Sequence, residues 1–285
     1  MESNFKIEDA NISIIGLGLM GGSLALSLKP RCRRLSAYDP DPATLELALR
    51  QEIVHVADGD PATILAGADL VILACPVPAI LDWLRSLPDY IQGPCIVLDI
   101  GSSKRTIVAA LESLPANFDP LGGHPICGRE RLSLENAERF LYRDAPFVLT
   151  PLSRTGERAR SAALQIIAAL GANPVWLDAG DHDRILAATS HLPYLVSSAL
   201  ALATPDETAS LIGPGFRSTA RLAGTPSSMM LGVMRSNRDN VLSALDRLQE
   251  QVAALKMALI LGDFNSLQKT LDTARAHYQN LVTDP

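Results

Sequence analysis

Short apolar runs alternate with longer stretches of helical character over the first 178 residues. The runs that we interpret as strands are Ile12–Ile15, Leu35–Tyr38, Leu70–Ala74, Ile96–Ile100, Phe147–Leu149 and Pro174–Leu177. The first four are apolar at nearly every position, which is typical of strands buried on both faces of a parallel sheet. Helical stretches such as Thr44–Arg50 and Glu157–Leu170 lie between several of them. This alternation predicts a doubly wound α/β domain.

After Asp178 the pattern becomes helical and no convincing strand follows. The predicted helices of this part are Asp181–Leu202, Asp206–Ile212, Asn237–Leu261 and Ser266–Asn280. We therefore expect an α/β domain over residues 1–179 and an all-helical domain over residues 180–285.

The helix predicted from Asn237 carries an apolar seam whose positions step by four and three residues. The seam consists of Val241, Leu245, Leu248, Val252, Leu255 and Leu259. Such a heptad pattern packs either inside one chain or against a second subunit. The expected assembly is a homodimer formed through the helical domain.

The composition excludes several classes of protein. With 47% hydrophobic and 20% charged residues in a chain of 285, the sequence is typical of a folded protein and not of a disordered one. A net charge of −6 argues against nucleic acid as a partner. No apolar run has the length of a membrane span, and the four cysteines form neither a zinc pattern nor a disulfide framework. We expect a cytoplasmic protein that binds no metal.

A glycine-rich loop follows the first predicted strand directly, with the sequence Gly16-Leu17-Gly18-Leu19-Met20-Gly21. In this pattern Gly16 permits a tight turn and Gly18 lets the backbone approach a pyrophosphate. Gly21 lets the following helix pack closely on the strand. Gly22 to Leu28 then predict a helix whose N-terminus offers free N–H groups to the phosphates, and Leu19 and Met20 complete the predicted cofactor-binding loop. A tight turn without a ligand is the alternative.

Asp39 lies at the end of the second predicted strand, about twenty residues after the glycines. An acidic side chain in this place binds the ribose hydroxyls of NAD and repels the 2′-phosphate of NADP. No arginine follows Asp39 directly, so the sequence favours NAD over NADP. A role as a turn cap alone is the alternative.

His124 lies among Gly122, Gly123, Pro125 and Gly128, which predict a rigid loop after the fourth predicted strand. Ligands of doubly wound sheets bind beyond the carboxyl ends of the strands, and a histidine there is well suited to be a general base.

Two serines follow the fourth predicted strand. Ser102 and Ser103 either cap a helix that begins near Lys104 or reach a neighbouring imidazole or the substrate.

The helical part carries further candidates. His191 precedes Pro193, whose missing N–H predicts a kink with freed carbonyls facing a cavity. Asp181, His182 and Asp183 have the composition of a metal site. Consecutive helical residues point in different directions, however, so we predict an acidic helix N-terminus there.

Arg217 and Arg221 are four residues apart, so on one helix they share a face. Few other charges lie nearby, and two guanidinium groups on one side are suited to binding a carboxylate at a buried anion site. An ordinary solvated basic face is the alternative.

These motifs, in this order, resemble the prephenate/arogenate dehydrogenase family of tyrosine biosynthesis. The resemblance covers about residues 11 to 260. After the glycine loop, it rests on Asp99–Lys104, Gly122–Pro125, Ala145–Pro151, Asp181–Asp183, Ser190–Pro193 and Gly215–Arg221.

The resemblance implies an NAD(P)-binding domain followed by a helical dimerisation domain, and an oxidative decarboxylation of prephenate, arogenate or both. His124 would accept the proton of the ring 4-hydroxyl, and Ser102 would orient His124 or the same hydroxyl. Arg221, supported by Arg217, would bind a substrate carboxylate. His191 would line the substrate pocket.

The sequence departs from the family's pattern near two of these residues. Ile126 and Cys127 stand where Met and Ala are common, and both keep apolar bulk. Tyr194 stands where many prephenate-preferring members have a second histidine, which leaves the choice between prephenate and arogenate open and makes Tyr194 a candidate substrate-binding residue.

Three other functions are alternatives to this interpretation. A β-hydroxyacid or imine dehydrogenase commonly needs a lysine in the helical domain, where only Lys256 and Lys269 are present. A related enzyme of a specialised pathway would act on amino-deoxyprephenate. A dinucleotide-sensing protein without activity is disfavoured because His124, Ser102 and Arg221 are all in place.

Overall fold

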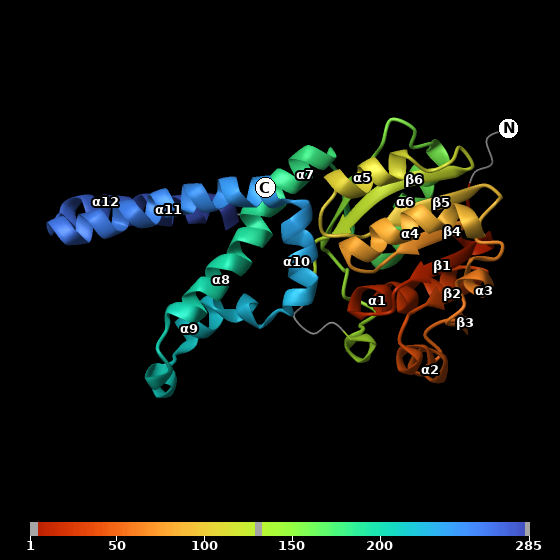
Figure 1. The fold of residues 1–285 in the computed structure, drawn as a ribbon, viewed down its shortest axis with the longest axis horizontal. Helices are drawn as coiled ribbons and strands as arrows, with labels where there is room; N and C mark the ends of the chain where they lie inside the picture. The colour runs from red at the N-terminus through yellow and green to blue at the C-terminus, as the bar shows by residue number, and fades with distance from the viewer. Residues whose placement is uncertain (1–4, 129–132, 283–285) are drawn as a thin grey trace. The chain divides into compact units, whose positions relative to one another are not determined.

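The computed structural model describes residues 5–128 and 133–282. Eight strands form one sheet in the order β3-β2-β1-β4-β5-β6-β7-β8 (Figure 1). They are β1 Asn11–Ile15, β2 Arg34–Tyr38, β3 Val56–Ala57, β4 Leu70–Leu73, β5 Cys95–Asp99, β6 Phe118–Pro125, β7 Pro146–Thr150 and β8 Asn173–Trp176. Strands β1 to β6 are parallel in the 3-2-1-4-5-6 order of doubly wound sheets, which confirms the predicted fold class.

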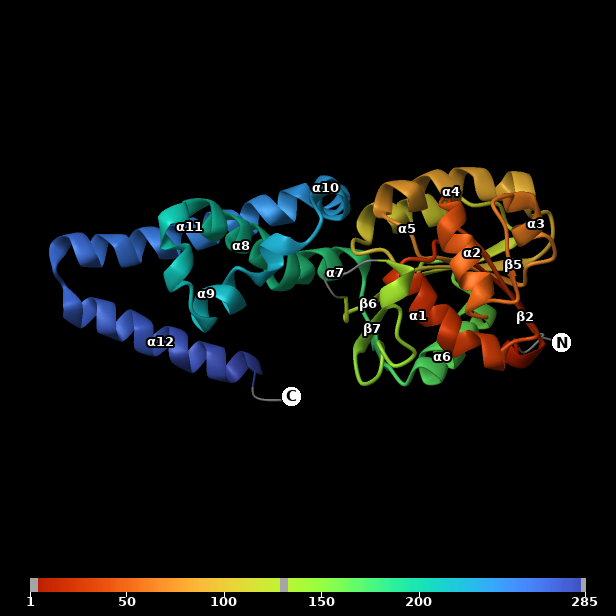
Figure 2. The same cartoon turned by 90° about the horizontal axis from the view of Figure 1, so that it is seen from below.

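Helices cover both faces of this sheet. They are α1 Leu19–Leu28, α2 Pro42–Arg50, α3 Pro61–Leu65, α4 Val77–Tyr90, α5 Arg105–Glu112 and α6 Glu157–Leu170, with short helical turns η1 Ile7–Asp9, η2 Lys29–Arg31 and η3 Leu134–Asn136. Figure 2 shows α4 and α5 on one side of the sheet and α1 and α6 on the other. In β4, Leu70 and Ile72 join the core under α1 and α6, whereas Val71 and Leu73 join the core under α4 and α5. Burial of both faces explains why these strands are apolar without alternation.

Strand β6 differs from the predicted loop. Phe118–Leu121 pairs in parallel with β5, and Gly122–Pro125 then pairs antiparallel with β7. His124 is therefore a strand residue, and its predicted position in a loop is wrong. Glycine is required here by the neighbouring strand, because a Cβ on Gly123 would lie 2.7 Å from the carbonyl oxygen of Asp99. The short strand β3 was also not predicted.

The helical segment begins with one long helix that combines α7 Ala179–Leu186, a π-helical turn η4 Ala187–His191 and α8 Leu192–Ala203. The 3-10 helices η5 Asp206–Leu211 and η6 Arg221–Gly224 and the α-helices α9 Pro214–Thr219 and α10 Ser227–Ser236 follow. The π-helical turn lies where Pro193 was expected to disturb the helix, since proline lacks the N–H that a regular turn needs.

By length and composition alone, the helix Ala179–Ala203 is apolar enough to cross a membrane, although no span was expected from the sequence. Its most apolar 18 residues have a mean hydropathy of 1.4, and 22% of them are buried. The same helix carries His182, Asp183 and His191, which are buried within the chain.

The chain forms two compact units, residues 1–238 and residues 239–285. The second contains most of α11 Arg238–Leu261 and all of α12 Phe264–Val282. In the seam of α11, Val252 is 53% exposed and Leu259 is 58% exposed. The predicted division of the sequence after residue 179 stays a prediction.

Replacing Gly123 with alanine tests the close packing of β6. We expect Gly123→Ala to lower the free energy of unfolding by about 1–3 kcal/mol, because the new methyl group meets the Asp99 carbonyl and the Phe147 ring. Urea denaturation measures the loss. Gly93→Ala is the matched control, since a Cβ there meets no atom within 4 Å. Equal stability of the two variants would show that β6 can move to make room.

Candidate functional site

The carboxyl ends of the central strands form one continuous edge. The Gly16 N–H donates to the Tyr38 carbonyl at 2.8 Å, and the Ala74 N–H donates to the Ile15 carbonyl at 2.8 Å. The Ile100 N–H extends the edge by donating to Leu73 at 3.0 Å. This is the edge at which doubly wound sheets bind ligands.

The glycine loop makes a tight cradle at this edge. Gly16 has a φ of +101°, and a Cβ there would lie 2.6 Å from the Ala74 carbonyl oxygen. A Cβ on Gly21 would lie 1.9 Å from the Gly16 carbonyl oxygen, so only glycine lets α1 begin this close to β1. Gly18 is the N-cap of α1, and no side chain of the described residues caps it. Its first turn therefore offers N–H groups to a pyrophosphate.

Asp39 links this cradle to the end of β2. Its carboxylate accepts hydrogen bonds from the Leu17 N–H at 2.8 Å and from the Asp41 N–H at 3.0 Å. Each oxygen accepts one of them and keeps a lone pair, so Asp39 can bind ribose hydroxyls while it caps the turn. The Leu19 side chain is buried in the core, and the Met20 carbonyl accepts a hydrogen bond from Tyr142 at 2.7 Å.

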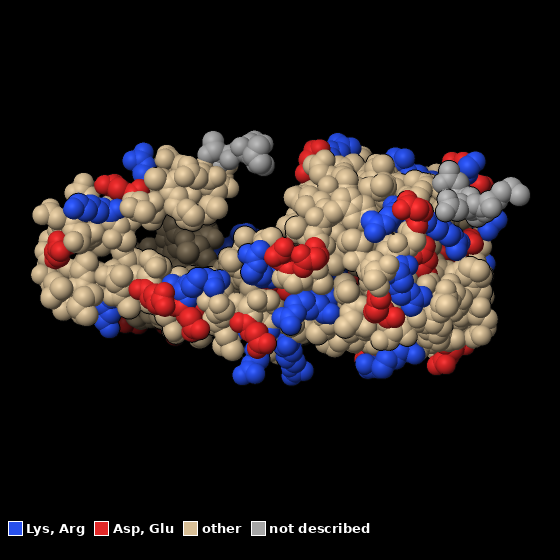
Figure 3. All heavy atoms as spheres, turned by 90° about the horizontal axis from the view of Figure 1, so that it is seen from above, with Lys and Arg blue, Asp and Glu red and all other residues tan. Residues whose placement is uncertain are grey.

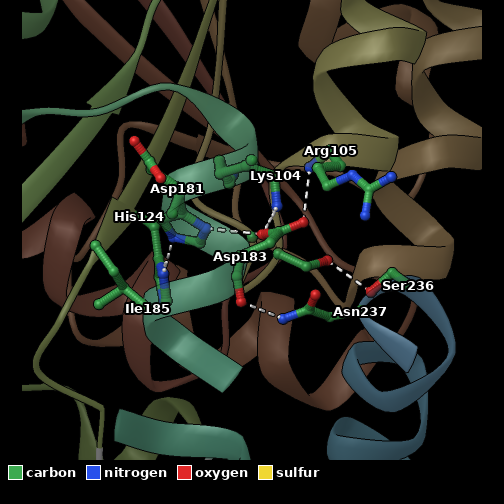
Figure 4. A network of polar contacts seen from close by, with 12 residues as sticks. Lys104, Arg105, His124, Asp181, Asp183, Ile185, Ser236 and Asn237 are labelled. Carbon is green, nitrogen blue, oxygen red and sulfur yellow. Dashed lines mark hydrogen bonds and ion pairs between the residues drawn. The ribbon is translucent and has the colours of Figure 1, made fainter. Parts of the chain in front are cut away.

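His124 begins a chain of hydrogen bonds that leads into the helical segment (Figure 4). Its Nδ1 lies 2.9 Å from Nε2 of His182, and Nδ1 of His182 lies 2.8 Å from Oδ1 of Asp183. His182 and Asp183 are completely buried on α7. The N-terminus of α7 is capped by Asp178, so His182 and Asp183 are not needed there. Asp181 pairs with Arg184 at 2.6 Å.

Asp183 caps α5 from the helical segment. Its carboxylate accepts hydrogen bonds from the Lys104 N–H at 2.6 Å and from the Arg105 N–H at 2.9 Å. Burial alone would raise the pKa of Asp183, but the hydrogen bonds from His182 and these two amides lower that pKa below its usual value. Capping by Ser102 or Ser103 is not found. The Ser103 hydroxyl instead lies 2.6 Å from the Ser236 hydroxyl.

A buried ion pair holds the strand ends beside His124. Nζ of Lys104 donates to Oδ2 of Asp99 and, at 2.6 Å, to the Gly123 carbonyl. The Asp99 carboxylate also accepts from the Gly101 N–H at 2.8 Å and from the Gly123 N–H at 3.3 Å. Both charged side chains are fully buried. The pair therefore ties the end of β5 to β6 immediately before His124.

The surroundings of His124 disfavour its protonated form. Burial lowers the pKa of His124 well below the usual 6.5, and the neighbouring His182, Lys104 and His191 lower this pKa further. The imidazole of His124 is therefore neutral at pH 7 and available as a base.

His191 presents an unpaired donor. The Asn237 amide nitrogen donates to the Asp183 carbonyl at 2.6 Å, which fixes the orientation of the amide, and lies 3.2 Å from Nδ1 of His191. Nδ1 of His191 therefore accepts. Burial lowers the pKa of His191 to about 4, so the ring is neutral and carries its proton on Nε2. This nitrogen is buried without a hydrogen-bond partner among the described residues. It is ready to donate to a ligand.

The other predicted site residues are more exposed. Ser102 is half-buried in the turn before α5, and Tyr194 is half-buried on α8. Arg217 is exposed on α9, and Arg221 is exposed at the start of η6. The prediction that both arginines share one helix is wrong because α9 ends at Thr219. Because both side chains are exposed, the described residues do not bury them as the predicted anion site requires.

Sequence reasoning missed His182, Asp183, Lys104 and Asn237 as parts of the network around His124. His182 and Asp183 lie in the segment Asp181–Asp183, which the sequence pattern predicted only as an acidic helix N-terminus. Among residues 5–128 and 133–282, no three His, Cys, Asp or Glu side chains are grouped to hold a metal ion.

Charges of both signs are mixed on the face shown in Figure 3.

Comparisons with known proteins cover nearly the whole chain. A family model described as the prephenate dehydrogenase nucleotide-binding domain matches residues 24–175, and one described as the prephenate dehydrogenase dimerization domain matches residues 178–273. The chain is 26% identical over 283 residues to the prephenate dehydrogenase of Bacillus subtilis (strain 168), covering 95% of this chain and 76% of that protein.

Two solved structures are similar over nearly the whole chain. Prephenate dehydrogenase from A. aeolicus, in complex with hydroxyphenyl propionate and NAD+, has a TM-score of 0.88 and 25% identity, covering 99% of this chain and 100% of that one. Synechocystis arogenate dehydrogenase has a TM-score of 0.80 and 27% identity, covering 95% of this chain and 100% of that one.

The buried ion pair yields a prediction about stability. Lys104→Met leaves the Asp99 carboxylate buried without its cation, and we expect the free energy of unfolding to fall by about 3–5 kcal/mol. Adding Asp99→Asn removes the uncompensated charge and should restore part of this loss. Urea denaturation measures both, with Lys269→Met on the exposed face of α12 as the control. A Lys104→Met protein as stable as the control would contradict the assigned role of the pair.

Proposed function

The chain belongs to the prephenate dehydrogenase family, and we propose that it catalyses the NAD-dependent oxidative decarboxylation of prephenate, arogenate or both. The products are 4-hydroxyphenylpyruvate and tyrosine respectively. The observation that carries this proposal is His124, a neutral histidine at the carboxyl edge of the sheet that bears the glycine cradle. A base in this position suits an alcohol that must lose its proton as it is oxidised.

The cofactor site fits NAD. Gly16, Gly18 and Gly21 shape the cradle for the pyrophosphate, and Asp39 lies at the end of β2 where it favours ribose hydroxyls over a 2′-phosphate. When bound, NAD supplies the acceptor for the hydride that leaves C4 of the substrate ring.

His124 handles the proton of this reaction. Its Nε2 accepts the hydrogen of the ring 4-hydroxyl as the carbon–oxygen bond gains carbonyl character. The bond to the ring carboxylate then breaks, carbon dioxide leaves, and its electron pair completes the aromatic ring while the proton returns to the phenol oxygen. Ser102, in the turn before α5, orients the hydroxyl or the imidazole.

The remaining candidates bind the polar groups of the substrate. Arg221, with Arg217 in support, binds a carboxylate through charge-assisted hydrogen bonds. His191 donates from Nε2 to a substrate oxygen, which would satisfy its unpaired proton. Tyr194, on the turn that follows His191, is the candidate determinant of the choice between a keto-acid and an amino-acid side chain.

The alternative of an imine or β-hydroxyacid dehydrogenase needs a lysine in the helical domain. Lys256 and Lys269 are exposed on α11 and α12, and neither has glycines beside it in the sequence, which disfavours this alternative.

We also propose that residues 180–285 form the substrate and dimerisation domain and that the protein acts as a homodimer. Large apolar side chains are more than half exposed along α11 and α12, including Val252, Leu259, Ile260, Phe264 and Leu281. A monomer rarely exposes so much apolar surface, so a second copy of this chain is the proposed cover. The cytoplasmic location of the protein stays a prediction.

The activity is tested by following NADH absorbance with prephenate and with arogenate in parallel. We expect turnover with NAD to exceed turnover with NADP, and His124→Asn to lower kcat at least ~10²-fold, because the base is removed. His277→Asn, on exposed α12, is the control. Near-normal turnover by His124→Asn would contradict the role of His124 as the base. Silence of the wild type with both substrates would remove the proposed function.

Charges placed in the seam of α11 test the homodimer. We expect the wild type to sediment as a dimer and the double variant Val252→Glu/Leu259→Glu to sediment as a monomer, because two carboxylates cannot be buried in an apolar interface without large cost. Gln251→Glu adds one charge beside the seam and should leave the dimer intact. A wild type that sediments only as monomer would contradict the assembly.

A further inference from the structure

The protons of the network around His124 can be assigned from its geometry. The Asp183 carboxylate accepts from two backbone amides, at Lys104 and Arg105, and backbone amides can only donate. It is therefore an acceptor toward His182 as well, and Nδ1 of His182 carries a proton that it donates over 2.8 Å.

The proton on His182 in turn fixes the proton on the His124 ring. When the His182 ring carries a single proton and that proton lies on Nδ1, its Nε2 is bare, and Nε2 lies 2.9 Å from Nδ1 of His124. One of these two nitrogens must donate, so Nδ1 of His124 carries the proton. Nε2 of His124 is then left with a free lone pair.

We propose that His182 and Asp183 are positioning residues that hold His124 in the tautomer with its proton on Nδ1 and its lone pair on Nε2. This inference rests on the proposed function, in which Nε2 of His124 accepts the substrate hydroxyl proton. The opposite tautomer would present a hydrogen to that hydroxyl and would have no lone pair to receive its proton.

The network is built to be rigid. The rings of His124 and His182 meet edge to face, with centroids 5.1 Å apart and planes at 61°. Asp183 is fixed at the N-terminus of α5, where the helix dipole also favours its negative charge. The chain thus joins β6, α7 and α5, and the reacting imidazole has no freedom to change tautomer without breaking a buried hydrogen bond.

Among the residues that the structure describes, three titratable groups bear directly on the protonation of His124. His182 lies on α7, Lys104 precedes α5 and His191 ends the π-helical turn, and each of the three, when it carries a positive charge, lowers the pKa of His124. Asp183 acts on it through His182. With a single proton His182 carries no charge and acts on His124 through the hydrogen bond at Nδ1, which stabilises the protonated imidazole, so removing His182 lowers the pKa of His124 further.

Two substitutions of His182 separate positioning from mere packing. His182→Gln offers an amide oxygen to His124 and an amide hydrogen to Asp183, whereas His182→Leu offers neither. We expect the Leu variant to lose at least ~30-fold in kcat with little change in KM, within the ~10⁴-fold limit known for a misoriented catalytic histidine. The Gln variant should retain most of the activity.

The pH profile adds a second readout. In His182→Leu, the acid limb of kcat/KM should move to lower pH, because Nδ1 of His124 loses the acceptor that stabilises the protonated imidazole. Asp181→Asn, on the same helix turn but half-exposed and paired with Arg184, is the matched control and should change neither limb. Thermal unfolding of each variant identifies any loss of folded protein.

The tautomer itself is read by NMR on the full chain labelled with 15N-histidine, with no substrate added. At pH 8, the wild type should show a protonated Nδ1 and a bare Nε2 for His124, assigned with His124→Asn, and His182→Leu should show a shift toward a protonated Nε2. A protonated Nε2 of His124 in the wild type overturns the proposal, as does equal activity of the Gln and Leu variants.

Failure of this inference is distinct from failure of the proposed function. If the wild type turns over prephenate or arogenate but His182→Leu matches it, the network is structural and the function stands. If the wild type is inactive with both substrates, the function falls while the NMR measurement still decides the tautomer.

Discussion

The carboxylate of Asp183 joins the sheet to the helices that follow it, and the geometry of the site depends on that junction. One side chain closes the N-terminus of α5, whose backbone would otherwise leave two N–H groups unpaired, and accepts a hydrogen bond from His182. The position of α7 and the orientation of His182, which holds the imidazole of His124, are thus set by the same three hydrogen bonds. A shift of α7 would therefore break the cap of α5 and misalign His124 at the same time.

A second constraint comes from charge. Lys104 is fully buried within the same network, and its partner Asp99 holds the glycine that precedes His124. The ion pair keeps the strand ends in register, while the cation lowers the pKa of the neighbouring histidine. The site therefore gains a neutral base from an element whose first role is structural. Replacing Lys104 by an apolar residue would affect both the fold and the protonation of His124.

The sequence predicted those parts of the fold that local pattern controls. Strands β1, β2, β4 and β5 are mostly apolar and are buried on both faces, and the glycine loop has glycine at Gly16 and Gly21, where a Cβ would have no room. Strand β6 was missed because Gly122, Gly123 and Pro125 have the composition of a loop, and only pairing with β5 and β7 makes them a strand. His124 was found by its surroundings, but the partner that orients it was not. His182 is 58 residues further along the chain, and no local pattern records that contact. The arginines illustrate the converse error, since a spacing of four predicts a shared face only if the helix continues through Ala220, and α9 ends before it.

The proposed chemistry explains why orientation, and not acid strength, is what this network supplies. Loss of carbon dioxide and formation of an aromatic ring make the overall reaction strongly downhill, so no strong base is needed to drive it. What the reaction needs is a neutral acceptor, held at the hydroxyl, while hydride leaves the same carbon. A protonated histidine there would oppose hydride loss by placing positive charge beside a carbon that becomes electron-poor. A low pKa and a fixed tautomer meet the same need: burial, with His182, Lys104 and His191 nearby, lowers the pKa of His124, and His182 at Nδ1 fixes the proposed tautomer.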